Sequence, residues 1–312
     1  MATLERMFGG AEVETFLGLP RCRDLGRIEA DIALIGAGMA TPYASVGPYC
    51  REAPAVLRAA SAAYAANLGH VNFDLGGPVF PAGRSAVDAG DLEQDEADPP
   101  GNRARIFGAV GRVLDAGAVP VLLGGDDSVQ IPMLEAFAAR GRRYAILQID
   151  AHIDWRDEVA GERLGLSSTM RRASEMAHIR RIVQVGARGI GSARSRDWAD
   201  AEAAGVEFVP AGEVARSGVG RAIDLLPEGS DVILCLDLDA LDPSIMPAVI
   251  GRTAGGLGYW QVLELIGGVA ERARIAGVGF VEFMPERDVD GQGALTAVQL
   301  LAAILGIVAR GR

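Results

Sequence analysis

The chain has 312 residues, and 30 basic residues against 41 acidic ones give it a formal net charge of −11 at pH 7. This balance argues against a protein that binds nucleic acid or an anionic membrane, because both partners require a positive surface that attracts phosphate. Hydrophobic residues make up 49% of the chain and charged residues 23%, which is typical of a folded globular protein and excludes a disordered one.

Short apolar runs alternate along the chain with Ala-, Leu- and Arg-rich segments of helical period, the pattern of repeated β-α-β units around a buried parallel sheet. The expected strands are residues 32–35, 119–123, 144–149, 182–185, 206–209, 232–238 and 278–283. The expected helices are residues 53–66, 106–115, 131–140, 168–176, 194–204, 214–226, 259–276 and 294–309. Residues 69–102 have the least regular pattern, and the acidic run at 93–98 is expected to be a solvated loop. No repeat or composition shift marks a boundary, so we expect a single α/β domain over residues 1–312.

The cysteines and the N-terminus indicate a reducing compartment. Cys22, Cys50 and Cys235 are odd in number and far apart, unlike the cysteines of a disulfide framework or a zinc ribbon. Residues 1–6 lack a basic segment followed by an apolar one, and no uninterrupted apolar run reaches about 18 residues. We therefore expect a soluble cytoplasmic protein.

Polar residues gather where three of the expected strands end. Residues 124–128 read Gly-Gly-Asp-Asp-Ser, residues 150–154 read Asp-Ala-His-Ile-Asp, and residues 237–243 read Asp-Leu-Asp-Ala-Leu-Asp-Pro. Ligands of open parallel sheets bind at the carboxyl ends of the strands, so these three segments are expected to converge on one crevice. Alternate residues of an extended segment project to one face, which brings Asp150, His152 and Asp154 together. The same spacing pairs Asp237 with Asp239.

Together with Asp127, these residues form a predicted cluster of five carboxylates and one imidazole. Five anions at this density would repel one another strongly or take up protons, and a pair of divalent cations removes the problem. Oxygen-rich ligation with one nitrogen favours Mn²⁺, with Ni²⁺ as the alternative, since Zn²⁺ prefers more His or Cys. Two ions about 3.5–4 Å apart, bridged by a shared carboxylate and a water, would yield a hydroxide nucleophile near neutral pH.

These three motifs resemble those of the ureohydrolase superfamily of arginases and agmatinases, and the resemblance extends over roughly residues 31–308. Weaker support comes from residues 88–91, 183–188, 255–257 and 281–282. Residues 170–173, Met-Arg-Arg-Ala, make the agmatinase branch the nearer one. The resemblance implies a three-layer α/β/α sandwich with an eight-stranded parallel sheet, commonly assembled into trimers or hexamers. It also implies hydrolysis of a guanidino carbon–nitrogen bond at a binuclear Mn²⁺ site.

The resemblance also implies a ligand set and catalytic roles. One metal would be held by Asp127, Asp150, Asp154 and Asp237, and the other by Asp150, His152, Asp237 and Asp239. Asp150 and Asp237 would bridge the two ions. The expected catalytic residues are His152 and Asp154, the latter placed to hydrogen-bond the substrate or to pass a proton to the leaving amine. Glu282 and Asp91 resemble family positions that orient loops.

The first departure from the family pattern is Asp127, which stands where the first metal ligand is normally His. The change raises the formal charge of the ligand set from four to five negative charges. Two divalent cations and a hydroxide then leave a net charge of −2 rather than −1, which favours a hard metal and makes the bound water less acidic.

Two further departures concern the substrate. A family segment Ser-His-Gly aligns with residues 165–168, which places Leu166 and Ser167 where a substrate-binding histidine is expected, and a proton shuttle must then be a serine, Asp154 or water. The Glu of a Thr-Pro-Glu-x-Gly-Gly-Leu segment aligns with Thr253, which cannot pair with a guanidinium through charge. Arg252 beside it would repel a cationic substrate and attract an acid. Trp155 could stack on a planar amidine.

The leading hypothesis is a metal-dependent hydrolase of a linear amidine or guanidine C–N bond, which releases urea or ammonia and an amine. The alternative is a catalytically degenerate paralogue that serves as the partner subunit of an active ureohydrolase, for example in a guanidine or biguanide hydrolase heteromer. The retained carboxylates argue for the enzyme, because a pocket that no longer binds metal has no physical reason to keep them together. The sequence does not specify the substrate, or whether the assembly is a homomeric trimer, a hexamer or a heteromer.

Overall fold

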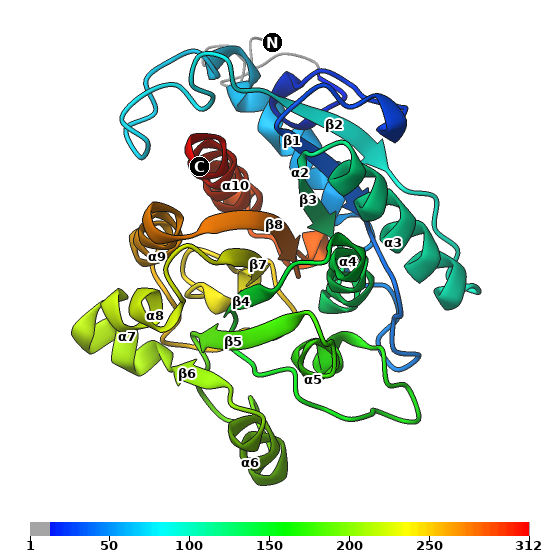
Figure 1. Cartoon of the computed structure of the whole chain (residues 1–312), viewed down its shortest axis with the longest axis vertical. Helices are drawn as coiled ribbons and strands as arrows, with labels where there is room; N and C mark the ends of the chain where they lie inside the picture. The colour runs from blue at the N-terminus through cyan, green and yellow to red at the C-terminus, as the bar shows by residue number, and fades with distance from the viewer. Residues whose placement is uncertain (1–12, 312) are drawn as a thin grey trace.

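The strands of this protein form one eight-stranded sheet, seen in a computed structural model that describes residues 13–311 (Figure 1). All paired strands are parallel, in the order β2-β1-β3-β8-β7-β4-β5-β6. The strands are β1 (Ile32–Ala37), β2 (Ala86–Asp91), β3 (Val119–Gly124), β4 (Tyr144–Ile149), β5 (Ile179–Val185), β6 (Glu207–Val209), β7 (Asp231–Asp237) and β8 (Arg274–Val281). The prediction drawn from residues 1–6 lies outside the described residues.

Helices cover both faces of the sheet because every central strand is apolar on both faces. In β1, Ile32 and Leu34 point into one hydrophobic core, whereas Ala33 and Ile35 point into the other. The first core is closed by α2, α7, α8, α9 and α10, and the second by α3, α4, α5 and α6, so that the sheet lies between two helical layers (Figure 1). The predicted three-layer α/β/α sandwich with an eight-stranded parallel sheet is confirmed.

The α-helices are α2 (Ala53–Ser61), α3 (Pro99–Asp115), α4 (Gln130–Ala136), α5 (Thr169–Ser174), α6 (Ser195–Ala203), α7 (Ala211–Ser217), α8 (Gly220–Leu225), α9 (Tyr259–Arg272) and α10 (Gln292–Arg310). The 3-10 helices are η1 (Phe16–Gly18), η2 (Leu25–Arg27), η3 (Ala62–Asn67), η4 (Asp127–Val129), η5 (Phe137–Arg140), η6 (Leu166–Ser168), η7 (Leu238–Ala240) and η8 (Pro285–Arg287). Within the described residues, α10 is the one helix long and apolar enough to cross a membrane, but 67% of its most apolar stretch is buried inside the protein, as in a core helix.

The irregular region contains more structure than the sequence predicted. Strand β2 was not expected, because its residues Ala-Val-Asp-Ala-Gly-Asp have little strand propensity. It is held at the sheet edge by Arg58, which forms an ion pair with the buried Asp88. Helix α3 begins at Pro99 rather than at residue 106, because Asp98 caps it by accepting a hydrogen bond from the Gly101 amide and the two prolines fit its first turn.

Two other boundaries differ from the prediction. The expected helix over residues 214–226 is split into α7 and α8 at Gly218, whose φ of +74° ends the first helix. The expected helix over residues 259–276 ends at Arg272, because β8 begins at Arg274 and residues 274 and 275 are already paired with β7. In both places tertiary pairing or backbone conformation overrides local helix propensity.

Replacing Arg58 with Met is expected to destabilise the protein by about 3–5 kcal/mol, because Asp88 is wholly buried and would lose the guanidinium that compensates its charge. The matched control is Arg27→Met, since the Arg27 side chain is 86% exposed. Urea denaturation followed by circular dichroism measures both changes. Equal unfolding midpoints for the two variants would contradict the importance of the buried pair.

Candidate metal centre and active site

The four central strands β3, β8, β7 and β4 deliver the polar side chains to one edge of the sheet. Asp127 opens η4 after β3, and Asp150 follows directly on β4. Asp237 is the last residue of β7, and Asp239 lies in η7 immediately after it. Because all four strands are parallel, their carboxyl ends meet, and the three predicted segments do converge.

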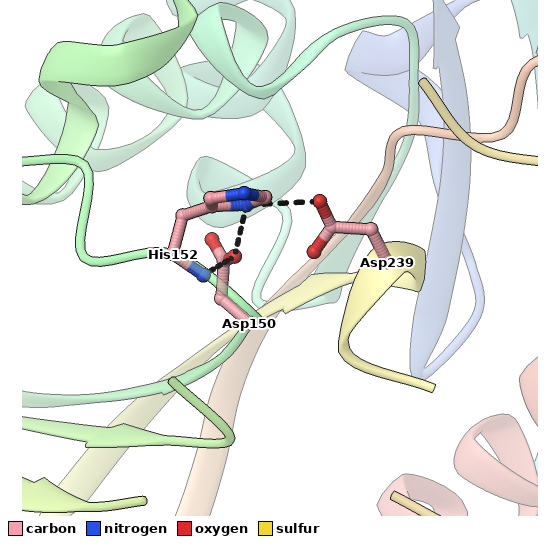
Figure 2. A group of neighbouring side chains, drawn as sticks. All are labelled: Asp150, His152 and Asp239. Atoms are coloured by element: carbon pink, nitrogen blue, oxygen red, sulfur yellow. Dashed lines mark hydrogen bonds and ion pairs between the residues drawn. The ribbon is translucent and has the colours of Figure 1, made fainter. Parts of the chain in front are cut away.

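One group of possible metal ligands consists of Asp150, His152 and Asp239 (Figure 2). The His152 Nδ1 atom lies 3.0 Å from Asp239 Oδ2 and 3.4 Å from Asp150 Oδ1. Backbone amides fix both carboxylates: His152 N donates to Asp150 Oδ1 at 2.6 Å, and Ala151 N donates to Asp239 Oδ1 at 3.1 Å. The figure shows the imidazole and the two carboxylates turned toward one another.

A second group consists of Asp127, Asp150 and Asp154, one oxygen of each lying within 4.8 Å of the others. Gln148, the last but one residue of β4, holds two of them: its Nε2 atom donates to Asp150 Oδ2 at 2.7 Å and to Asp154 Oδ2 at 2.8 Å. Asp154 has a φ of 44°, a left-handed conformation that a non-glycine residue rarely adopts. Asp150 is common to both groups.

Asp237 lines the same pocket but belongs to neither group. Its Oδ1 accepts a hydrogen bond of 2.7 Å from the Asp239 amide, which closes the turn that starts η7. The predicted bridging role of Asp237 therefore stays a prediction, whereas Asp150 has the shared position that a bridging ligand needs.

Burial gives these carboxylates unusual proton affinities. Asp127, Asp150, Asp154, Asp237 and Asp239 are each at most 8% exposed. Burial raises the pKa of Asp127 and of Asp154 well above the usual value, and the negative charge of Asp150 adds to the effect in both. Burial and the charge of Asp239 raise the pKa of Asp237 in the same way.

The His152 imidazole and the neighbouring carboxylates stabilise each other's charged forms. Burial disfavours its charged form, but hydrogen bonds and attraction from Asp150 and Asp239 outweigh burial and raise the pKa of His152 to about 11. Burial likewise favours the neutral form of Asp150, yet the contact with His152 lowers the pKa of Asp150 below its usual value. The site thus contains more negative charge than one imidazolium can compensate.

The donor set fits divalent cations. One carboxylate oxygen, Asp127 Oδ2, is buried and has no hydrogen-bond partner, which is costly for an anion unless a cation or a proton compensates it. Asp127, Asp150 and Asp154 offer oxygen atoms only, and the group of Asp150, His152 and Asp239 adds one nitrogen. Both sets match the ligands of Mn²⁺ in proteins.

A cavity of about 190 Å³ opens above the two groups. Asp127, His152, Asp154, Asp237 and Asp239 line its acidic end. The side walls include the predicted substrate residues Trp155, Leu166 and Ser167, and also Arg156, for which contact with the far end of a substrate and a solvated position were both open from the sequence. Other wall residues were not predicted to line the pocket, namely Tyr49, Ser192, Asp197, Ile250, Gly251 and Glu282. Trp155 is 3% exposed and packs into the second hydrophobic core as well.

The structure places Arg252 and Thr253 outside the residues that line this cavity. The Arg252 guanidinium donates to the backbone carbonyls of Pro247 and Arg287, and the Thr253 hydroxyl donates to the carbonyl of Gly251. These hydrogen bonds do not direct either side chain toward the acidic end of the cavity. Their roles in substrate binding stay predictions.

Glu282, expected from the sequence only to orient a loop, also lines the cavity. It follows β8, has a φ of 69°, and is 3% exposed. Its carboxylate accepts hydrogen bonds from the Tyr49 hydroxyl at 2.8 and 2.9 Å and from the Asp127 amide at 2.9 Å. Asp91, given a similar role in the sequence analysis, pairs with Arg58 at the end of β2 instead.

Arg188 holds two loops together through hydrogen bonds. Its guanidinium donates to the carbonyls of Asp239, Ala240 and Leu241 and to that of Thr253. It therefore ties the turn after β7 to residues 251–254. Gly251 in that loop approaches the ligands so closely that a Cβ atom there would lie 2.9 Å from His152 Cε1 and 3.0 Å from Asp239 Oδ2. No sequence motif signals either contact, since both depend on distant strands.

A parallel sheet covered on both faces, with carboxylates and one imidazole gathered at its carboxyl edge, defines an α/β protein with a candidate metal centre. The sequence model of the arginase family matches residues 30–306. The human mitochondrial guanidino acid hydrolase is 30% identical over 283 residues, which cover 88% of this chain and 77% of that protein. The mitochondrial agmatinase of Gallus gallus is 29% identical over 287 residues, covering 89% and 81% of the two chains.

The fold has solved counterparts. The proclavaminate amidino hydrolase of Streptomyces clavuligerus superposes with a TM-score of 0.83 at 27% identity, over 97% of this chain and 99% of that one. The chain belongs to the arginase family, and its similarity to agmatinases and guanidino hydrolases agrees with the agmatinase branch.

Metal binding at this centre is expected to release protons and to weaken as the pH falls. The pKa values of Asp127, Asp154 and Asp237 are raised, and that of His152 is raised to about 11, so protons compete with a cation for these groups. Calorimetric titration with Mn²⁺ between about pH 6 and 8, in buffers of different ionisation enthalpy, measures both effects. An affinity that is independent of pH, with heats independent of the buffer, would contradict this coupling.

Proposed function

We propose that this protein is a metal-dependent hydrolase of a C–N bond in a linear amidine or guanidine, releasing urea or ammonia and an amine. The observation that carries the proposal is the pair of ligand groups that share Asp150 at the acidic end of a cavity. Family membership supports the reaction class, because the related proteins are named as guanidino and amidino hydrolases and as agmatinases.

Two divalent cations are the proposed cofactor, with Mn²⁺ preferred and Ni²⁺ as the alternative. Asp127, Asp150 and Asp154 would hold one, and Asp150, His152 and Asp239 the other, with Asp237 beside them. Such a pair of ions, when bound, would supply an acidified water as the nucleophile.

Glu282 is proposed to hold the guanidinium of the substrate. Its carboxylate lines the cavity and belongs to neither ligand group. Burial and the nearby charge of Asp126 raise the pKa of Glu282, and a bound cationic guanidinium would stabilise its ionised form. Glu282 can thus supply the charge that Thr253 lacks.

The outer wall of the cavity suggests a substrate with a carboxylate at its other end. Arg156 is the one arginine among the described residues of the wall, and Asp197 of α6 pairs with it. The Arg156–Asp197 pair leaves further guanidinium donors free for a planar carboxylate. We therefore propose an ω-guanidino acid or a related amidino acid, in line with the name of the human relative.

Within the cavity, Asp154 and Ser167 are the proposed proton-handling groups. Asp154 lines the acidic end, and burial together with the charge of Asp150 raises its pKa, which favours its taking up a proton. Ser167 lines the same cavity, where its hydroxyl can hydrogen-bond the leaving amine.

The full-length protein supplied with Mn²⁺ is expected to release urea or ammonia from a panel of guanidino acids, agmatine, arginine, formimino acids and biguanides. Glu282→Gln keeps the hydrogen bonds to Tyr49 and Asp127 but removes the charge, so kcat/KM should fall about 10- to 100-fold. Glu264→Gln, on the exposed face of α9, is the matched control.

Elemental analysis accompanies the assay. No turnover on this panel by protein that carries metal would refute the proposed reaction. Protein that takes up no metal at all would instead favour the alternative role as a partner subunit of an active family member.

Arg156→Gln is expected to raise KM for a guanidino acid about 10- to 100-fold, because a charge-assisted pair with the substrate carboxylate is lost. An amine-tailed substrate such as agmatine should bind as well or better, since Asp197 is then unpaired. Arg163→Gln on the same loop, with a side chain that is 55% exposed, is the control. Equal losses for the acid and the amine would show that Arg156 supports the fold rather than selecting the substrate.

A further inference from the structure

Asp127 is held on three sides, which leaves a single carboxylate oxygen without a partner. Its backbone amide donates to Glu282 Oε1 at 2.9 Å, and its backbone carbonyl accepts from Thr169 Oγ1 at 3.2 Å. Its Oδ1 accepts a hydrogen bond from Gln130 Nε2. The remaining oxygen, Oδ2, is buried and has no hydrogen-bond partner.

Gln130 is fully buried at the start of α4, and its Nε2 atom faces Asp127. An ionised carboxylate accepts hydrogen bonds but does not donate them, so this orientation of the amide is the one that suits Asp127 when it is ionised to bind a cation. The amide lies next to Gly279 of strand β8. A Cβ atom at position 279 would lie 2.1 Å from Gln130 Oε1 and 2.8 Å from its Cδ, so the glycine provides the space that the amide occupies.

The two ligand groups therefore differ in chemistry. Asp127, Asp150 and Asp154 offer three carboxylates and no nitrogen, whereas Asp150, His152 and Asp239 include an imidazole. Carboxylate oxygens suit hard cations such as Mn²⁺ and Mg²⁺, and imidazole suits Zn²⁺ and Ni²⁺. An Asp at position 127, where the family pattern has His, makes the first group the harder of the two.

We propose that Gln130 is a positioning residue that engages Oδ1 of Asp127 and leaves Oδ2 for a cation, so that the group of Asp127, Asp150 and Asp154 selects Mn²⁺ or Mg²⁺ over Zn²⁺ or Ni²⁺. This inference rests on the proposed function only in assuming that the centre binds divalent cations. A neutral amide is suited to the task because it orients the carboxylate without adding a charge. Glu at position 130 would add a sixth acid, and Met would fill the same space without a donor.

The test uses the full-length protein after chelation, titrated with Mn²⁺ by calorimetry and followed by electron paramagnetic resonance. Gln130→Met removes the donor, and Gly279→Ala displaces the amide without changing Gln130. Each variant is expected to bind one of the two Mn²⁺ ions about tenfold more weakly, with the other affinity unchanged and the spin-coupled Mn²⁺ pair signal lost. Gly267→Ala is the control, since a Cβ atom there meets nothing within 4 Å.

Selectivity is measured by competition between Mn²⁺ and Zn²⁺ in the wild type and in Asp127→His. At one of the two sites the ratio of the Mn²⁺ affinity to the Zn²⁺ affinity should be higher in the wild type than in Asp127→His, because imidazole favours Zn²⁺. Wild-type affinity for both Mn²⁺ ions in Gln130→Met and in Gly279→Ala would overturn the positioning role, and an unaltered preference in Asp127→His would overturn the selectivity. Should Gln130→Met fail to fold, Gly279→Ala alone decides the first point.

Failure of this inference is distinguishable from failure of the proposed function. A wild type that binds two Mn²⁺ ions but hydrolyses no compound of the panel refutes the reaction and leaves the role of Gln130 to be decided by the titrations. A wild type that binds no Mn²⁺ overturns both.

Discussion

Electrostatic repulsion among buried carboxylates is the constraint around which this structure is organised. Five aspartates at the carboxyl edge of the central strands are nearly inaccessible to water, so their charges are poorly screened. Four hydrogen-bond donors contact these carboxylates: the backbone amides of Ala151, His152 and Asp239, and the side-chain amide of Gln148. These donors orient the oxygens but do not remove the excess charge, and the cluster is stable only with cations or protons among them.

The parallel sheet makes this concentration of charge possible. Apolar residues alternate between two cores along every central strand, and this burial fixes the strand register. The register between β4 and β5 also orients a side chain of the site, because it pairs two glutamines. Gln148 lies directly opposite Gln184, which donates to Gln148 Oε1 and to the carbonyl of Ile153. Gln148 is thereby held with its own donor pointing at Asp150 and Asp154.

Some parts of the fold and the site could be predicted from sequence because their signals are local. Strand β4 was predicted to the residue, since an uninterrupted apolar run precedes the motif that begins at Asp150. The gathering of Asp150, His152 and Asp239 followed from their positions after strands of one parallel sheet. Strand β2 could not be predicted, because what stabilises it is a buried arginine from a helix thirty residues earlier in the chain, Arg58 with Asp88.

In the cavity wall, too, contacts between residues that are distant in the chain could not be predicted from local sequence. Glu282 and Arg188 acquire their roles from neighbours that are distant in the chain, and no local spacing indicates those neighbours. Arg252 was expected near the substrate from its place in an alignment. In the folded chain its guanidinium is engaged by two backbone carbonyls, and Arg156 on a different loop lies at the wall instead.

Glu282 joins the centre from far along the polypeptide: it is 155 residues from Asp127 and 233 from Tyr49, yet it bonds to both. During synthesis the three aspartate-rich segments leave the ribosome well before β8 does. Strand β8 lies between β3 and β7, so the strands that carry these segments cannot adopt their complete order in the sheet until β8 has been synthesised. The part of the cavity wall that Glu282 provides is therefore completed only after most of the chain has been made.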